Sequence, residues 1–208
     1  GIFALNAQGL NGAMVVMISH GLVTGALFLL VGVIYNRAHT REIAAFGGLA
    51  TNMPVYASFL GLFTFASLGL PGLSGFVGEF LAILGAFRDY RWAGIVSMAV
   101  VIFAAWYMLW MYQRVAWVRA PGEPPDATDP EARLLAAQGE TGGPRPVTGG
   151  DHAAVNPRTF PDVTWQEIVT VAPLAVLTIV VGVYPESLMG LFRPVVALLL
   201  QPFGGSGL

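Results

Sequence analysis

The stretch ASLGLPGLSGFVGEFLAILGAF, from Ala66 to Phe87, decides the fold of this chain. The apolar region from Met53 to Phe87 is about 35 residues long, whereas one membrane span needs roughly 20. A single straight helix is therefore too long. Proline removes a backbone donor and glycine frees the backbone, so these residues mark where the helix breaks. We expect two half-helices joined by unwound backbone, which survives at membrane depth only beside protein or a water-filled cavity.

The residues expected to form the break are the glycines and the proline of this stretch: Gly69, Pro71, Gly72, Gly75 and Gly78. Glu79 follows them directly, and an ionisable side chain inside a membrane span is costly and indicates function by default. Burial disfavours its ionised form, whereas water or a nearby cation favours it, so a carboxylate between these influences can load and release protons. The alternative is a structural glutamate that binds free amides at the break.

The composition assigns the whole chain to the membrane class. Of its 208 residues, 55% are hydrophobic and 11% are charged, which indicates an integral membrane protein rather than a soluble domain. The formal net charge of −2 offers no basic surface for nucleic acid, and the lack of cysteine excludes disulfides, thiol catalysis and cysteine-ligated iron–sulfur clusters. The chain begins at Gly1 without a signal-peptide pattern, so we expect a piece of a longer protein.

We expect an all-α membrane bundle of about four transmembrane helices, one of them broken between Gly69 and Gly75, plus a short interfacial C-terminal helix. The chain divides into three parts: residues 1–117, with spans at about 12–35, 53–87 and 92–113; residues 118–164, a disordered polar loop; and residues 165–208, with the final span and the interfacial helix. Residues 1–11 are expected to be a loop or a frayed helix end.

Two local signals accompany these spans. Gly21 and Gly25 have the small-xxx-small spacing that lets another helix approach closely. Asn52 is in position to cap the next helix, with Pro54 tolerated in the first turn.

Three motifs occur together and in order along the chain. They are SHG at Ser19–Gly21, HTREI at His39–Ile43, and the LPG…FVGEF block of the broken span. With these motifs the chain resembles the antiporter-like membrane subunit M of respiratory complex I, the proton-pumping NADH:quinone oxidoreductase, whose mitochondrial counterpart is NADH dehydrogenase subunit 4. The likeness is strong over residues 1–117, moderate over 165–200 and absent across 119–162.

The resemblance implies a fourteen-helix antiporter-like fold with two inverted repeats, each containing a broken helix. This chain would hold roughly the last four of those helices, the C-terminal portion, with its broken span matching the second broken helix. It would be a proton-translocating subunit of the oxidoreductase in the bacterial inner membrane, beside other complex I membrane subunits and, indirectly, the hydrophilic arm. The residues show no metal-ligand spacing, and the resemblance implies no redox centre in this chain, with NADH, FMN, iron–sulfur clusters and quinone expected in partner subunits.

The expected proton relay consists of Glu79 and His20, bridged by water. In the resembled family the matching glutamate serves the last steps of the proton path towards the outer face, and a histidine in the SHG context belongs to the central polar axis. Histidine can hold or pass a proton near neutral pH, although a buried packing histidine is the alternative from the residues alone. The expected supporting residues are Ser19, Thr24 and Ser74, which orient water or simply pack helices, and His39, which anchors the interface or assists proton uptake.

Two other functions stay open. A subunit of a multi-subunit Na⁺/H⁺ antiporter or of a membrane-bound hydrogenase would share the fold, and co-purifying subunits would distinguish it. A scaffold whose polar residues only pack helices belongs to another class. A water-filled pocket at Glu79 argues against the scaffold, whereas a dry and fully hydrogen-bonded Glu79 favours it.

Overall fold

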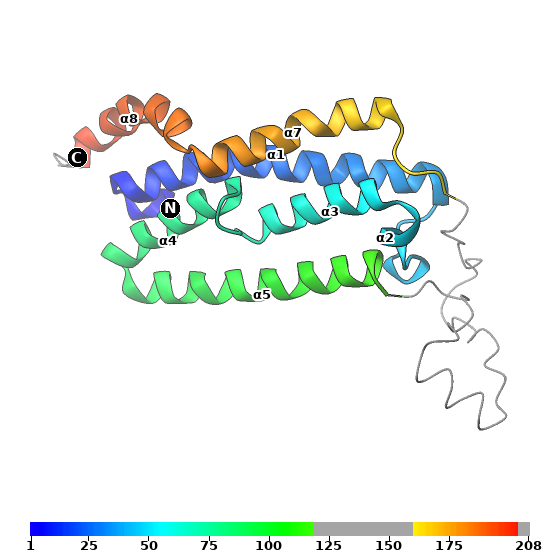
Figure 1. Cartoon of the computed structure of the whole chain (residues 1–208). Helices are drawn as coiled ribbons and strands as arrows, with labels where there is room; N and C mark the ends of the chain where they lie inside the picture. Colours follow the sequence, from blue (N-terminus) through cyan, green and yellow to red (C-terminus); the bar gives the residue numbers. More distant parts are fainter. Residues whose placement is uncertain (119–159, 204–208) are drawn as a thin grey trace, which may run out of the picture.

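The computed structural model describes residues 1–118 and 160–203, and in these ranges it is built from helices (Figure 1). The helices in chain order are η1 (Ile2–Ala4), α1 (Ala7–Ala38), η2 (Ile43–Ala45), α2 (Leu49–Asn52), α3 (Pro54–Ser67), α4 (Ser74–Asp89), α5 (Arg91–Ala116), α7 (Trp165–Val183), α8 (Glu186–Leu200) and η4 (Gln201–Phe203). Figure 1 shows the long helices running alongside one another, with α3 and α4 in succession between α1 and α5.

Helices α3 and α4 together form one crossing of the membrane, in addition to the three that α1, α5 and α7 form. In the described ranges, α1, α5 and α7 are each long and apolar enough to cross a membrane. Helix α3 has 14 residues and α4 has 16. At 1.5 Å per residue these are about 21 Å and 24 Å long, each short of the roughly 30 Å hydrocarbon layer. Neither half crosses alone, and the predicted all-α fold with one broken helix is confirmed.

Helix α1 begins at Ala7, earlier than the span expected from about residue 12, and the predicted loop at the start of the chain is largely helical. The reason is a cap. The Gly9 N–H donates to Asn6 Oδ1 at 2.7 Å, and Asn6 Nδ2 donates to the Gly85 carbonyl at 2.8 Å. Asn6 thus starts α1, as asparagine commonly does at this position, and also fastens it to α4, a contact that no local pattern indicated.

Helices α1 and α4 pack with their backbones in contact. A methyl group on Gly12 would lie 2.4 Å from Ala82 N, and one on Gly78 would lie 2.7 Å from Val16 N. Lipid tails are as apolar as leucine, so helices in a membrane associate mainly through close packing at small residues. Glycine at these positions therefore sets the distance between the two helices.

Helix α7 covers the break from another side. A methyl group on Gly182 would lie 2.4 Å from the Gly72 carbonyl oxygen and equally close to the Leu73 backbone. The core extends from this contact between α1, α3 and α7, and its largest fully buried apolar side chains are Leu30, Leu49, Met53, Tyr56 and Phe63. Helix α7 thus covers the break at the Gly72 carbonyl and Leu73, while Leu70, Pro71 and Gly72 are exposed.

The expected cap of α3 by Asn52 is wrong. Asn52 ends the short α2, and Met53, at the capping position, offers no side-chain acceptor. Asp162 takes this role, because its carboxylate accepts from the Val55 N–H at 2.9 Å and the Tyr56 N–H at 3.1 Å. The N-terminus of α3 is therefore capped by a residue more than a hundred positions away in sequence.

The end of the predicted disordered loop is ordered. Phe160 and Val163 pack against the core, and Asp162 caps α3, so residues 160–164 belong to the bundle. Residues 119–159 of the predicted loop lie outside the described residues. The loop therefore ends earlier than the sequence pattern suggested, because Phe160 and Val163 pack on the core, the Asp162 carboxylate bonds α3, and two backbone carbonyls accept from Arg37 of α1.

The close contact of α1 and α4 gives a test of the packing. We expect Gly12→Ala to lower the free energy of unfolding by about 1–3 kcal/mol, because its methyl group overlaps α4 backbone. Gly190→Ala is the matched control, since nothing lies within 4 Å of its methyl position in the described structure. Thermal unfolding of the purified membrane protein would measure both, and equal midpoints for the two variants would contradict the packing argument.

Candidate functional site

Helix α3 ends in a Schellman motif. The Leu70 N–H donates to the Phe65 carbonyl at 3.1 Å, and the Gly69 N–H donates to the Ala66 carbonyl at 3.3 Å. Gly69 has φ 70°, the left-handed conformation that this motif requires and that glycine adopts without strain. The helix is thus stopped by its own sequence.

A tight turn follows and completes the break. The Leu73 N–H donates to the Leu70 carbonyl at 3.0 Å across Pro71 and Gly72, and Gly72 has φ 94°. Proline at the second position and a glycine of positive φ at the third are the features of a type II turn. The predicted unwound segment therefore consists of residues 68–73. The Leu68, Gly69 and Leu70 N–H groups donate to carbonyls of α3, and the Leu73 N–H donates to the Leu70 carbonyl.

Gly75 and Gly78 do not belong to the unwound backbone, contrary to the prediction. Both lie inside α4, where the absence of a side chain serves close contact. A methyl group on Gly75 would lie 2.1 Å from the Ala66 carbonyl oxygen at the end of α3, and Gly78 faces α1. Gly75 therefore holds the two half-helices together, and Gly78 holds the second half against α1.

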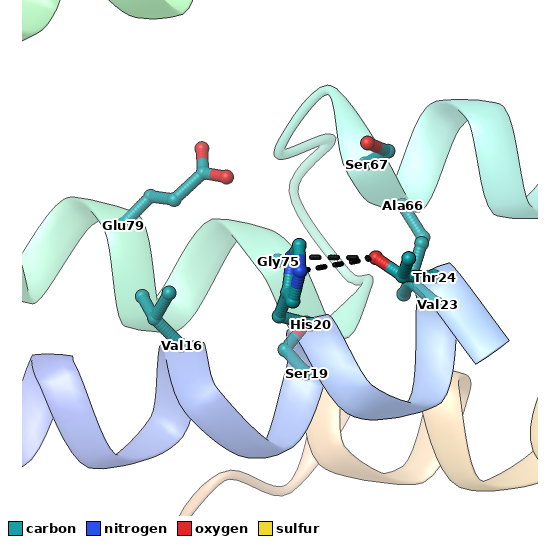
Figure 2. A pocket seen from close by; sticks show the side chains of 9 residues that line it. All are labelled: Val16, Ser19, His20, Val23, Thr24, Ala66, Ser67, Gly75 and Glu79. Atoms are coloured by element: carbon teal, nitrogen blue, oxygen red, sulfur yellow. Dashed lines mark hydrogen bonds between the residues drawn. The ribbon is translucent and has the colours of Figure 1, made fainter.

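Glu79 lies in the second turn of α4, half-buried, with its carboxylate beside the break. A methyl group on Gly69 would lie 2.7 Å from Glu79 Oε2, so the carboxylate occupies space that only glycine leaves open. Within the described part of the chain Glu79 forms no side-chain hydrogen bond and no ion pair (Figure 2). The alternative of a glutamate bonded to free amides at the break is therefore not what these residues form.

Glu79 and His20 line one pocket of about 60 Å³. Its walls come from α1, α3 and α4: Val16, Ser19, His20, Val23, Thr24, Ala66, Ser67, Gly75 and Glu79 (Figure 2). A site of this size with several polar groups has room for a few water molecules. The structure thus brings together the two relay residues predicted from sequence, along with two of the supporting ones.

His20 is exposed, so the alternative of a buried packing histidine does not fit the described structure. Its Nδ1 lies 3.3 Å from Thr24 Oγ1, one turn further along α1. Methyl groups on Gly21 and Gly25 would meet nothing within 4 Å in the described part of the chain. The predicted approach of another helix to these two glycines stays a prediction.

Ser19 and Ser74 are buried and face each other, with 2.8 Å between their Oγ atoms. The bond joins α1 to the first turn of α4. Ser19 lines the pocket and Ser74 does not. Helix packing, the simpler of the two predicted roles, therefore accounts for Ser74, while Ser19 serves the packing and the pocket wall together.

A second hollow, of about 450 Å³, lies on the other side of Glu79 between α4 and α5. Apart from Glu79 and Gly69, its lining is apolar and includes Phe76, Phe80 and Met98. Glu79 thus borders a small polar pocket on one side and a large apolar hollow on the other.

His39 is remote from this site. It lies 19 positions beyond His20 along α1, which is about 29 Å at 1.5 Å per residue. It ends the helix with φ 53°, its N–H donating to the Tyr35 carbonyl at 2.8 Å and its ring edge-on to the Tyr35 ring. The predicted role as an interface anchor fits this position, and a part in proton uptake stays a prediction.

The sequence reasoning missed a polar cluster at the membrane end of α1. Arg37 donates to both carboxylate oxygens of Glu167, at 2.9 and 2.8 Å, and to the carbonyls of Val33, Pro161 and Asp162. The sequence did contain one signal for part of this cluster. Thr164 and Glu167 have the T-x-x-E spacing of a capping box, which the structure shows at the start of α7.

The groups that the pocket offers are a carboxyl, an imidazole and hydroxyls, which can exchange protons with one another through water. Its volume suits water rather than an organic cofactor. Across residues 1–118 and 160–203, no group of three or more His, Asp or Glu side chains could hold a metal ion.

Comparisons with known proteins agree with one another. The family model described as NADH:quinone oxidoreductase/Mrp antiporter, transmembrane, matches residues 1–105. NADH-quinone oxidoreductase subunit M of Rhodobacter capsulatus is 42% identical over 203 residues, which cover 98% of this chain. NADH-ubiquinone oxidoreductase chain 4 of Marchantia polymorpha is 44% identical over 117 residues, which cover 56% of this chain and 24% of that protein.

A solved structure has the same arrangement of helices. A chain of respiratory complex I from Thermus thermophilus with bound NADH superposes with a TM-score of 0.73 at 28% identity, over 98% of this chain and 36% of that chain. The present chain covers 33% of the Rhodobacter capsulatus protein, so it spans about one third of the length of the relatives that match it along its whole length.

The position of Glu79 against Gly69 can be tested by chemical modification. We expect Gly69→Ala to change the rate at which a hydrophobic carbodiimide labels Glu79 by severalfold, because the new methyl group displaces Oε2. Gly72→Ala is the matched control. Gly72 also has a positive φ, so alanine at either position causes a similar backbone strain of about 1–3 kcal/mol. At Gly72, however, nothing lies within 4 Å of the added methyl group. Equal labelling of Glu79 in both variants, measured by peptide mass spectrometry, would show that the contact is unimportant.

Proposed function

Because this chain belongs to the NADH:quinone oxidoreductase/Mrp antiporter family of membrane proteins, as a relative of subunit M, we propose that it translocates protons as part of an NADH:quinone oxidoreductase. The resemblance inferred from the SHG, HTREI and FVGEF motifs is thereby confirmed. With its apolar helices and its bacterial relatives, the chain is a multi-pass protein of the inner membrane. In this proposal it works beside other membrane subunits of the same complex.

The Glu79 carboxylate is the observation that carries the proposal. It lies beside the break without a hydrogen-bond partner among the described residues, and it shares a water-sized pocket with His20. An acid inside a membrane costs free energy, and a structural role would require bonds that repay this cost. A proton-carrying role requires instead that the carboxylate stay accessible to water, and a pocket large enough for water beside Glu79 supports it.

The two sides of Glu79 suggest how it changes protonation. Water in the pocket favours the ionised carboxylate, whereas the apolar hollow towards α5 favours the neutral acid. A proton held by the His20 imidazole reaches Glu79 through pocket water, with the Thr24 hydroxyl beside His20 orienting the chain of hydrogen bonds. A change in the hydration of the pocket then switches Glu79 between its loaded and unloaded forms.

The redox chemistry belongs to partner subunits in this proposal. NADH, FMN, iron–sulfur clusters and quinone would be bound there, and electron transfer in those subunits would set the hydration of the pocket. This chain takes part in the oxidoreductase reaction as the membrane unit that moves protons.

A second candidate is a subunit of a Na⁺/H⁺ antiporter, because the matching family model also covers Mrp antiporters. The names of the relatives that match 98% of the chain favour the oxidoreductase, since they are subunits M of that enzyme. Purifying the intact complex from its own membrane would distinguish the two, because only the oxidoreductase brings NADH-oxidising subunits with it.

Replacement of the buried acid is the direct test. We expect Glu79→Gln to lower proton pumping by NADH-energised membrane vesicles at least about tenfold and to slow coupled quinone reduction, because an amide cannot load a proton. Glu186→Gln is the matched control, since Glu186 forms an exposed ion pair with Arg193 away from the pocket. Pumping by Glu79→Gln at the unaltered rate would end the assignment.

The role of His20 in the relay is tested by a separate variant. We expect His20→Ala to reduce the number of protons pumped per NADH oxidised, because the imidazole is the second titratable group of the pocket. Glu186→Gln, at the exposed ion pair with Arg193 away from the pocket, should leave this number unchanged. An unaltered proton-to-electron ratio in His20→Ala would remove His20 from the relay.

A further inference from the structure

The N-terminus of α3 is capped by the side chain of Asp162, which lies more than a hundred positions further along the chain. The amides of Val55 and Tyr56 lie in the first helical turn, where no intrahelical acceptor exists. Both donate to the carboxylate of Asp162, at 2.9 and 3.1 Å. A carboxylate there also interacts favourably with the helix dipole.

Arg37 holds Asp162 in place. A guanidinium has five N–H donors, and all five are used here. They bond to Glu167 Oε1 and Oε2, and to the carbonyls of Val33, Pro161 and Asp162, at 2.8–3.3 Å. Since Arg37 lies on α1 and Glu167 on α7, the segment that carries Asp162 is fixed to both helices.

The other end of α3 forms part of the Glu79 site. Ala66 and Ser67, in its last turn, line the pocket, and the Ala66 carbonyl is in close contact with Gly75 of α4. Gly69, directly after the helix, leaves the space that the Glu79 carboxylate fills. A shift of α3 along its axis therefore moves the wall of the pocket relative to Glu79.

We propose that Asp162 is a positioning residue for the Glu79 site, which sets the axial position of α3 by capping its first turn from the segment clamped by Arg37. This inference rests on the proposed function for its effect on pumping. Its structural part, the coupling of the α3 cap to the environment of Glu79, stands apart from that function.

The test compares variants in the intact complex. We expect Asp162→Ala to speed amide exchange at the start of α3 about tenfold, as loss of a cap does. It should also shift the carboxyl infrared band of Glu79, identified by its loss in Glu79→Gln, and lower the protons pumped per NADH about twofold or more. Asp162→Asn, which keeps one acceptor oxygen, should restore these properties in part.

Thr170→Ala is the matched control, because it removes an exposed side-chain bond to the Gln166 carbonyl within α7 and leaves the cap of α3 and the bonds of Arg37 in place. An unshifted Glu79 band in Asp162→Ala, or an equal shift in Thr170→Ala, would overturn the proposal. If Asp162→Ala does not assemble, the same comparison with Asp162→Asn decides. Normal pumping by Glu79→Gln would refute the proposed function alone, since amide exchange and the infrared band would still report the coupling.

Discussion

The arrangement of this bundle depends on the backbone contact between α1 and α4. At Gly12 and Gly78 the two helices approach so closely that no side chain fits between them. This contact places His20 of one helix and Glu79 of the other on the walls of a single pocket. In a membrane, where apolar side chains gain little from leaving lipid, the close fit of small residues supplies much of the attraction between helices.

The charged side chains of the bundle differ in whether they are hydrogen-bonded. At the membrane end, Arg37 uses every donor it has, and Glu167 and Asp162 are bonded in turn. Near the break, Glu79 has no such partner among the described residues, although the neighbouring Gly69, Leu70 and Leu73 N–H groups donate to backbone carbonyls. A satisfied cluster fixes helices, whereas an unsatisfied acid beside water remains free to change its charge.

The features that could be predicted from sequence are those that depend on neighbouring residues alone. Gly69, Pro71 and Gly72 stop one helix and turn the chain through conformations that can be inferred from residue type, so the break and the position of Glu79 could be predicted. The cap of α3 and the bond of Asn6 to α4 could not, because Asp162 and Asn6 reach these partners across 79 or more positions of sequence. The exposure of His20 likewise depends on which faces of α1 the other helices cover.

The contact of α7 with the break has an evolutionary consequence. Gly182 touches the Gly72 carbonyl and the Leu73 backbone so closely that even one added carbon would displace the turn. Residues 72 and 182 are far apart in sequence but share one small volume. During descent, a larger side chain at 182 would be tolerated only together with a compensating change in the turn, so the two positions are expected to covary.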